Sequence, residues 1–264
     1  MDTEERKSRQ ALQIVLDIGA QMLSSGAEIS RVEDSIIRMC HAFGAETVDC
    51  FAITYVIVVT ISGEHTAGLT EIRRIRAFDR NMYKLTQLNA LSREICETPV
   101  TPEQAAEKLR EIESRKSYSL LGKMGIFALI SLSFTLFFGG SIRDMAVSAL
   151  IGILIAPVET ILSDSGMNQF VQVFLCSAVA GFLSIAMAGI WRGVSSELVS
   201  IGNIMIFIPG VIFTCAIQEI FSNNMLSGLT RLGEAVITSL VIATGFVLVN
   251  VALCPARAGQ DSGS

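Results

Sequence analysis

The sequence is short of charged residues, and the shortage is concentrated in its second half. Of 264 residues only 17% are charged and 51% are hydrophobic, whereas a soluble domain carries about 25% charged residues. Of the 20 Lys and Arg residues, 15 precede Tyr118, and so do 18 of the 25 Asp and Glu residues. This asymmetry predicts that the first part of the chain folds in water and the second part in lipid.

The chain also lacks the residues that several classes of binding site require. Its net charge of −5 provides no basic surface for the phosphates of nucleic acid. His41 and His65 have no ligand-like partners in the sequence, and none of the six cysteines belongs to a Cys-x-x-Cys pair. We therefore expect no nucleic-acid partner, no metal site, no disulfide framework and no cofactor.

Motifs of nucleotide-driven transport and of common hydrolases are missing as well. The sequence contains no Gly-x-x-x-x-Gly-Lys-Ser/Thr loop, no His-Glu-x-x-His, no Gly-x-Ser-x-Gly and no paired aspartates in its apolar half. We therefore expect neither ATP-driven transport nor an enzyme. The first ten residues are charged and lack the apolar core of a signal peptide, so the N-terminal part is expected to stay in the cytoplasm.

Residues 1–117 have the pattern of a small cytoplasmic α+β domain. Segment 47–62 is dense in β-branched and aromatic residues and predicts one long or two short strands, with a returning strand in 65–75. Apolar residues at helical spacing, or helix-start signals, predict helices at 11–22, 28–43, 78–95 and 103–115. Thr101 is the expected N-cap of the last of these helices, with Pro102 in its first turn.

Residues 118–254 predict an all-α bundle of about five transmembrane helices. Apolar windows of about 20 residues, the length of a membrane crossing, occur at 120–138, 142–162, 170–190, 198–221 and 235–253. Short polar joints are expected between them, including one at 222–234, and a disordered tail at 255–264. Basic residues before the first window place the N-terminal domain on the cytoplasmic side of the cell (inner) membrane. An odd number of crossings then puts the C-terminus outside.

The fourth window contains a potential helix break at Pro209-Gly210. Proline removes a backbone donor and clashes with the preceding turn. Transporters build solute sites from such interrupted helices, although a passive kink would have the same sequence. If the break forms a site, the candidate substrate-binding residues are Asn203, Pro209, Gly210 and Gln218.

Three carboxylates in or beside the windows are candidates for proton coupling. Glu159 follows Ala156-Pro157 near the end of the second window, Glu219 lies near the end of the fourth, and Glu234 precedes the fifth. Ionisable residues within a membrane are costly and are functional candidates by default. The alternative is that they lie at the lipid–water interface or cap helix ends.

The string GAEISRVE at Gly26–Glu33 is the most unusual in the N-terminal part. Its charged members can form an ordinary solvated helix start, because acidic residues are favoured at a helix N-terminus. Alternatively, Gly26, Glu28, Arg31 and Glu33 form a contact surface for the membrane part or for a partner.

The order of these segments resembles the threonine/serine exporter family (ThrE), in its shorter, split, YjjP-like type. The resemblance rests on Gly26–Glu33, the β-rich segment, the several spans, Ile208-Pro209-Gly210 and the Gly-x-x-Arg that ends at Arg231. It implies export of threonine and serine, or of a dicarboxylate such as succinate. It also implies a separate small YjjB-like membrane partner and self-association.

Two functions are therefore weighed. The first is a secondary exporter of a small polar or acidic metabolite, driven by the proton gradient because no nucleotide motif is present. The second is a membrane-anchored sensor or scaffold whose soluble domain binds a ligand or protein. The number of polar and helix-breaking positions in the spans favours the first, because a simple anchor does not need them.

Overall fold

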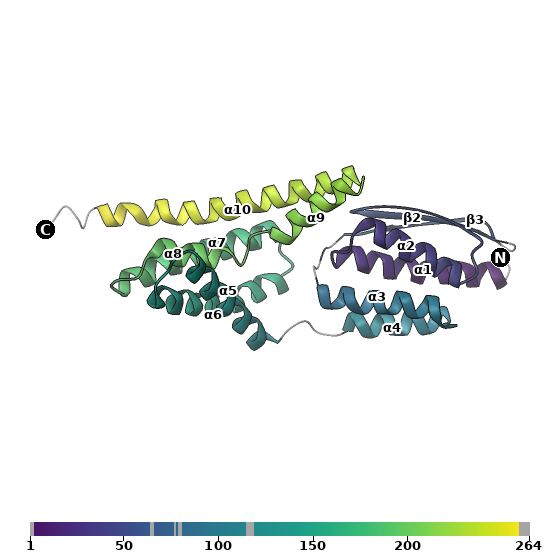
Figure 1. Ribbon diagram of the computed structural model, residues 1–264, viewed down its shortest axis with the longest axis horizontal. Coiled ribbons are helices and arrows are strands. Elements are labelled where there is room, and N and C mark those ends of the chain that lie inside the picture. Colours follow the sequence, from purple (N-terminus) through teal and green to yellow (C-terminus); the bar gives the residue numbers. More distant parts are fainter. Residues whose placement is uncertain (1–2, 64–65, 77, 79–80, 115–118, 259–264) are drawn as a thin grey trace. The chain divides into compact units, whose positions relative to one another are not determined.

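The structure is a computed structural model that describes residues 3–63, 66–76, 78, 81–114 and 119–258. His65 and residues 259–264 of the predicted tail lie outside the described residues. Contacts divide the chain into two units (Figure 1). Unit 1 comprises Met1–Lys116 together with Thr214–Leu232, and unit 2 comprises Ser117–Phe213 together with Gly233–Ser264. Helices α9 (Gly210–Phe221) and α10 (Met225–Ala258) therefore contribute residues to both units.

Unit 1 is built on a three-stranded antiparallel sheet of order β1-β2-β3. Segment 47–62 forms two strands, β1 (Thr47–Ile53) and β2 (Val56–Gly63), and β3 (Thr66–Arg74) returns beside β2. Side chains of a strand alternate between its two faces. Alternate residues of β2, namely Ile57, Val59 and Ile61, are accordingly buried in the core.

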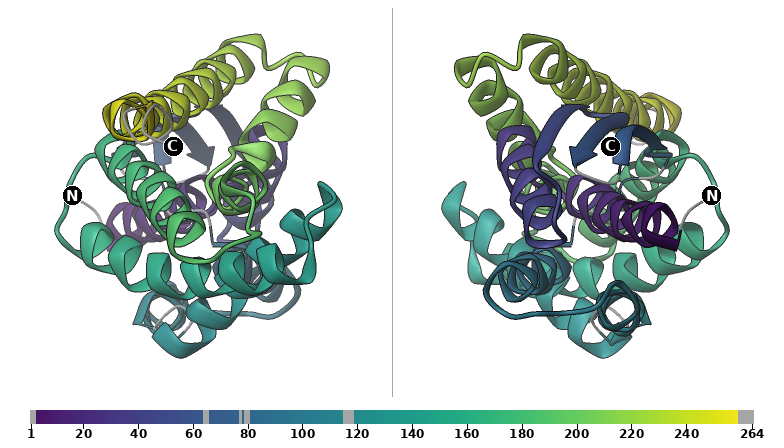
Figure 2. Two further views of the ribbon diagram at one scale, coloured as in Figure 1. Left: turned by 90° about the vertical axis from the view of Figure 1, so that its left-hand side faces the viewer. Right: turned by 90° about the vertical axis from the view of Figure 1, so that its right-hand side faces the viewer.

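Four helices complete the N-terminal part of unit 1: α1 (Thr3–Ser24), α2 (Ile29–Ala42), α3 (Met82–Glu97) and α4 (Pro102–Ser114). Helices α1 and α2 form a layer between the sheet and the pair α3–α4 (Figures 1 and 2). The predicted cap of α4 is confirmed, because the Thr101 hydroxyl accepts from Gln104 N at 3.3 Å and the Gln104 side chain accepts from Thr101 N at 3.0 Å. Two backbone donors are thereby satisfied, as in a capping box.

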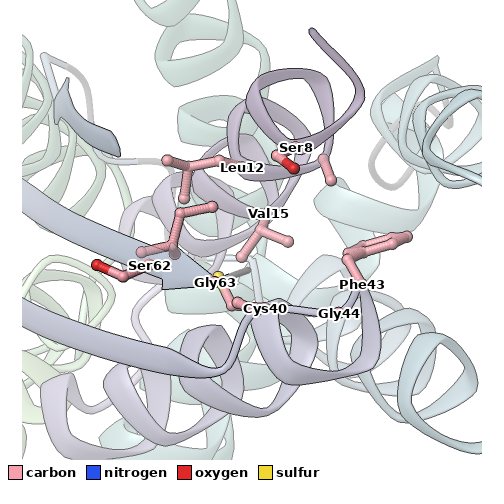
Figure 3. A pocket seen from close by; sticks show the side chains of 11 residues that line it. Ser8, Leu12, Val15, Cys40, Phe43, Gly44, Ser62 and Gly63 are labelled. Atoms are coloured by element: carbon pink, nitrogen blue, oxygen red, sulfur yellow. The ribbon is translucent and has the colours of Figure 1, made fainter. Parts of the chain in front are cut away.

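The core of unit 1 contains a small cavity of about 30 Å³ between α1, the end of α2 and the end of β2 (Figure 3). Leu12, Val15, Cys40 and Phe43 are among its lining side chains. Burial raises the pKa of the Cys40 thiol to about 12, so it stays protonated at neutral pH. A space of this size admits a water molecule at most, and we do not regard it as a solute site.

Helices of membrane-spanning length lie wholly or mainly in unit 2. Four described helices are long and apolar enough to cross a membrane: α5 (Leu120–Phe137), α6 (Ile142–Asp164), α7 (Gln169–Ile190) and the Met225–Ala252 part of α10 (Met225–Ala258). The window 198–221 contains two shorter helices, α8 (Ser196–Ile204) and α9 (Gly210–Phe221), with residues 205–209 between them.

The predicted polar joint at 222–234 is wrong for most of its length, because α10 already begins at Met225. Ser227, Arg231, Ala235 and Thr238 recur at helical spacing and are all buried. The polar residues among them face protein instead of solvent, and hydropathy alone does not distinguish these two environments. Between α9 and α10, Asn223 adopts φ 66°, a left-handed conformation that asparagine tolerates better than most residues.

Candidate functional site

The string Gly26–Glu33 forms the turn between α1 and α2 in unit 1. Gly26 has φ 101°, which a glycine adopts without steric cost. This geometry ends α1 and lets Ala27 N return to Met22 O at 3.0 Å. Glu28 then occupies the N-cap position of α2, but its side chain makes no capping hydrogen bond. The first N–H groups of α2 therefore need acceptors from elsewhere.

Glu219 of α9 supplies one such acceptor. Its Oε1 accepts a hydrogen bond from Ile29 N at 3.0 Å, across 190 residues of sequence, and its Oε2 accepts from Asn224 Nδ2 at 3.0 Å. The residue is only 1% exposed. A carboxylate at a helix N-terminus is stabilised both by the free N–H groups and by the helix dipole, which offsets part of the cost of its burial.

Arg231 of α10 lies beside this carboxylate. It is 8% exposed, its Nη2 donates to Ala27 O at 3.0 Å, and the same atom lies 3.9 Å from Glu219 Oε1. The turn between α1 and α2 thus presents a carbonyl to the cation and an N–H to the anion. The two charges are buried together, which is the condition under which buried charges are tolerated.

Glu28, in the α1–α2 turn, makes two further hydrogen bonds to the segment around Glu219. Its two carboxylate oxygens accept from Gln218 Nε2 at 2.9 Å and from Ser222 Oγ at 3.3 Å. Glu28, Gln218, Glu219, Ser222 and Arg231 are called the carboxylate–arginine cluster below. It joins the α1–α2 turn to the end of α9 and the start of α10, all within unit 1.

The other two charged residues of the string have different surroundings. Arg31 is largely exposed and pairs at 3.5 Å with Glu28, the N-cap residue three positions earlier. Glu33 Oε1 accepts from Ala52 N at 2.7 Å and so links α2 to β1. The same hairpin also reaches α10, because Thr54 N donates to Ser227 Oγ at 3.3 Å.

Asn203 lies on α8 in unit 2, fully buried among hydroxyl groups. Its Oδ1 accepts from Ser131 Oγ at 2.9 Å, and its Nδ2 donates to Ser148 Oγ at 3.1 Å and to Val199 O at 2.8 Å. Thr135 Oγ1 donates to Ser148 Oγ at 2.8 Å. These four side chains, Ser131, Thr135, Ser148 and Asn203, form the hydroxyl–amide cluster, which fastens α5, α6 and α8 together.

Pro209 and Gly210 line an open hollow of about 500 Å³ in unit 2. The rest of its lining comes from Ile208 and Phe213 and from the α10 residues Ala235, Val236, Ser239 and Leu240. A Cβ atom added to Gly210 would meet no atom within 4 Å. The lining is mainly apolar, and Ser239 is its one polar side chain among the residues named.

The three candidate proton-coupling carboxylates are not brought together. Glu159 of α6 forms an ion pair with Lys123 of α5, whose ammonium lies 6.0 Å from the centre of the Phe127 ring. Glu234 is half-buried on α10 in unit 2, whereas Glu219 belongs to unit 1. Among the described residues, no group of three or more His, Cys, Asp or Glu side chains could hold a metal ion.

Sequence patterns identify the candidate carboxylates but not the basic residues that pair with them. The sequence indicates Arg231 only as the end of Gly-x-x-Arg and assigns Lys123 no role. The i, i+4 recurrence of Ser227, Arg231 and Ala235 was the available signal that this segment is a helix with a buried face. No comparable signal links Lys123 to Glu159.

Comparison with known proteins gives a consistent family. The model of the ThrE family, described as "Putative threonine/serine exporter", matches residues 13–253. A "Probable threonine/serine exporter" of Mycobacterium tuberculosis is 22% identical over 253 residues, which cover 93% of this chain and 46% of that protein. "Pheromone-regulated membrane protein 10" of Candida albicans is 26% identical over 253 residues, covering 84% of this chain and 22% of that protein.

The same-named protein of Saccharomyces cerevisiae S288c is 26% identical over 191 residues, which cover 70% of this chain and 50% of that protein. The chain thus spans half or less of the length of these curated relatives. No solved structure matches it. Because the family model covers nearly the whole sequence, the chain belongs to the threonine/serine exporter family.

Proposed function

We propose that the chain is the subunit of a membrane exporter that moves a small polar or acidic metabolite, with α8 and α9 forming one interrupted membrane crossing. Family membership supports transport. The observation that carries the proposal is the interruption itself: α8 ends at Ile204 and α9 begins at Gly210, beside an open hollow. The backbone hydrogen bonds here are irregular, because Ile206 N and Phe207 N donate three residues back and Gly210 N two residues back. Non-helical backbone at membrane depth is tolerated only where it faces protein or a water-filled cavity.

In this proposal the solute binds in the hollow beside Pro209 and Gly210, at the start of α9. The positive end of the α9 helix dipole suits the carboxylate of an amino acid or dicarboxylate. Asn203 acts by holding α8 in place, because its own amide is already engaged in three hydrogen bonds. Gln218 acts through Glu28, to which it donates.

Glu159 is the proposed proton-coupling residue. It lies on a candidate span, about three helical turns beyond Ser148 of the hydroxyl–amide cluster, and its pairing with Lys123 joins α6 to α5. Protonation of Glu159 would remove the anionic half of that pair and loosen the contact. Charged residues within a membrane that pair with one another commonly mark ion and proton pathways. Glu219 and Glu234 are the other two candidates. Glu219 is less suited, because its carboxylate already accepts from Ile29 N and lies beside Arg231.

The finer assignments follow the family resemblance. The solute is proposed to be threonine or serine, or a dicarboxylate such as succinate, and the partner a small YjjB-like membrane protein. The N-terminal part of unit 1 is proposed to lie in the cytoplasm, with five crossings of the inner membrane and self-association of the chain. The name of the Mycobacterium tuberculosis relative supports threonine and serine as the first solutes to test.

The test is solute efflux from proteoliposomes that contain the chain and its partner and are preloaded with labelled threonine, serine or succinate. We expect Pro209→Ala and Glu159→Gln each to slow efflux by about tenfold or more, equivalent to about 1.4 kcal/mol in the barrier. Asp164→Asn, an exposed carboxylate at the end of the same helix, is the matched control. Unchanged efflux in Pro209→Ala would remove the proposed solute site, and unchanged efflux in Glu159→Gln would remove the coupling role.

A further inference from the structure

Unit 1 contains a larger hollow, of about 680 Å³, that none of the features above uses. It lies among α1, β3, α3 and α4, and no residue of the carboxylate–arginine cluster lines it. Its basic lining residues are Arg73, Arg74, Arg76, Lys84 and Arg110. Its two acidic lining residues are Asp17 and Glu113, which leaves an excess of three positive charges in a protein whose net charge is −5.

Both acidic residues are already engaged. Asp17 Oδ1 lies 2.7 Å from Arg73 Nη2. Glu113 accepts from Gln21 Nε2 at 2.6 Å, and the same amide accepts from Lys84 Nζ at 2.6 Å. These two hydrogen bonds link α3 to α4 through Gln21 of α1, and they fix two walls of the hollow relative to each other.

Three basic groups of this lining have no carboxylate partner among the described residues. Within the described part of the chain, no ion pair includes Arg74, Arg76 or Arg110. The Nε of Arg73 is buried and has no hydrogen-bond partner there. Like charges held close together repel unless an anion lies between them, so this arrangement favours an external anion.

We propose that this hollow binds a small solute carrying at least two anionic groups, phosphate or carboxylate. Its volume lies within the range of small-molecule sites, about 300–1,000 Å³. Guanidinium groups match carboxylate and phosphate oxygens through two parallel hydrogen bonds. The three arginines that form no ion pair with a described residue come from β3, the segment after it and α4, so two separate anionic groups satisfy them better than one. Such a ligand ties the sheet to the α3–α4 pair.

The shared chemistry has two sources, a soluble polyanion or the headgroup of an anionic lipid. The first arm of the experiment is isothermal titration of the full chain in non-ionic detergent, at fixed ionic strength, with inorganic pyrophosphate and with citrate. We expect saturable binding of at least one probe. Arg74→Gln and Arg110→Gln each remove a charge-assisted hydrogen bond and weaken binding by about tenfold, or about 100-fold together.

Both substituted arginines are exposed, so these variants are expected to fold, which circular dichroism and gel filtration verify. Arg93→Gln, an exposed arginine of α3 outside the hollow, is the matched control and leaves the affinity unchanged. The charge-retaining pair Arg74→Lys and Arg110→Lys recovers part of the affinity. Absence of saturable binding to either probe, or an equal loss in Arg93→Gln, overturns the proposal.

The second arm repeats the titration in nanodiscs with and without phosphatidic acid. Competition between this lipid and pyrophosphate, abolished by the same two substitutions, identifies a lipid headgroup as the occupant in the membrane. Undiminished pyrophosphate binding identifies a soluble anion. Because the readout is binding and not efflux, failure of this site is distinguishable from failure of the exporter proposal.

Discussion

The two units hold distant segments together with buried polar groups, but they use opposite chemistry. The carboxylate–arginine cluster of unit 1 contains the buried charges of Glu219 and Arg231, 1% and 8% exposed. The hydroxyl–amide cluster of unit 2 contains only neutral groups, and its four side chains are all 0% exposed. Both clusters join elements that lie far apart in the sequence.

The difference predicts how each cluster responds to damage. A buried charge whose partner is removed keeps its desolvation cost and loses its compensation, which costs about 3–5 kcal/mol. A neutral hydrogen bond between membrane helices is worth about 0.6 kcal/mol on average, because the unfolded helices find other partners. Removing one charged partner should therefore disrupt the whole carboxylate–arginine cluster of unit 1. Removing one hydrogen bond of the hydroxyl–amide cluster should lower the stability of unit 2 only slightly.

The largest effect is expected for Arg231→Gln. This change leaves the Glu219 carboxylate buried without a cation and shortens the donor that reaches Ala27 O. We expect a loss of about 3–5 kcal/mol in local stability. The measurement is native-state hydrogen exchange of residues 26–33, because the Ile29 amide is itself bonded to Glu219.

Arg38→Gln provides the control for Arg231→Gln. Arg38 is an exposed arginine whose i,i+4 pair with Asp34 is worth about 0.3–0.5 kcal/mol. Adding Glu219→Gln to Arg231→Gln removes the orphaned charge and should restore part of the protection. If Arg231→Gln and Arg38→Gln had equal effects on exchange, the cluster would not hold these segments together.

An effect of intermediate size is expected for Gly202→Ala, at a close approach between α8 and α5. A Cβ atom on Gly202 would lie 2.0 Å from Thr135 Oγ1 and 2.9 Å from Ser131 O, so Gly202→Ala must push α8 away from α5. Such overpacking costs about 1–3 kcal/mol. Unfolding in mixed detergent micelles measures it.

Gly189→Ala is the matched substitution, because a Cβ at Gly189 meets nothing within 4 Å. It lies within α7, where alanine is the better helix former by up to about 1 kcal/mol. Stability should therefore fall in Gly202→Ala and stay equal or rise in Gly189→Ala. Equal behaviour of the two variants would show that the close approach of α8 to α5 is not a stability determinant.

Much of the fold can be predicted from local sequence, wherever a single local factor such as β-propensity, helix capping or hydropathy determines the structure. β-branched residues in 47–62 give strands, and Thr101 with Pro102 gives a capped helix start. Length and hydropathy give α5, α6 and α7 nearly to the residue. The start of α10 could not be placed, because Ser227 and Arg231 look like a solvated joint until their buried partners are known.

The candidate sites were predictable as residue types but not as pairs. Glu28 and Gln218 are separated by 190 residues, and hydropathy or spacing gives no rule that brings them together. Lys123 and Glu159 are likewise matched only by the packing of α5 on α6. Single-residue chemistry marks which groups are costly to bury, and the tertiary structure decides what compensates each of them.

The smallest effect, and the sharpest test of the comparison, is Ser131→Ala. Ser131 Oγ donates across helices to Asn203, whereas Ser184 Oγ, equally buried, donates to Ala180 O within its own helix. Both substitutions remove one hydroxyl from a 0% exposed site, so their difference isolates the interhelical bond. We expect Ser131→Ala to cost about 0.6 kcal/mol more than Ser184→Ala in micelle unfolding. A difference above about 3 kcal/mol would mean that the neutral cluster behaves like the charged one, and the contrast between the two units would fail.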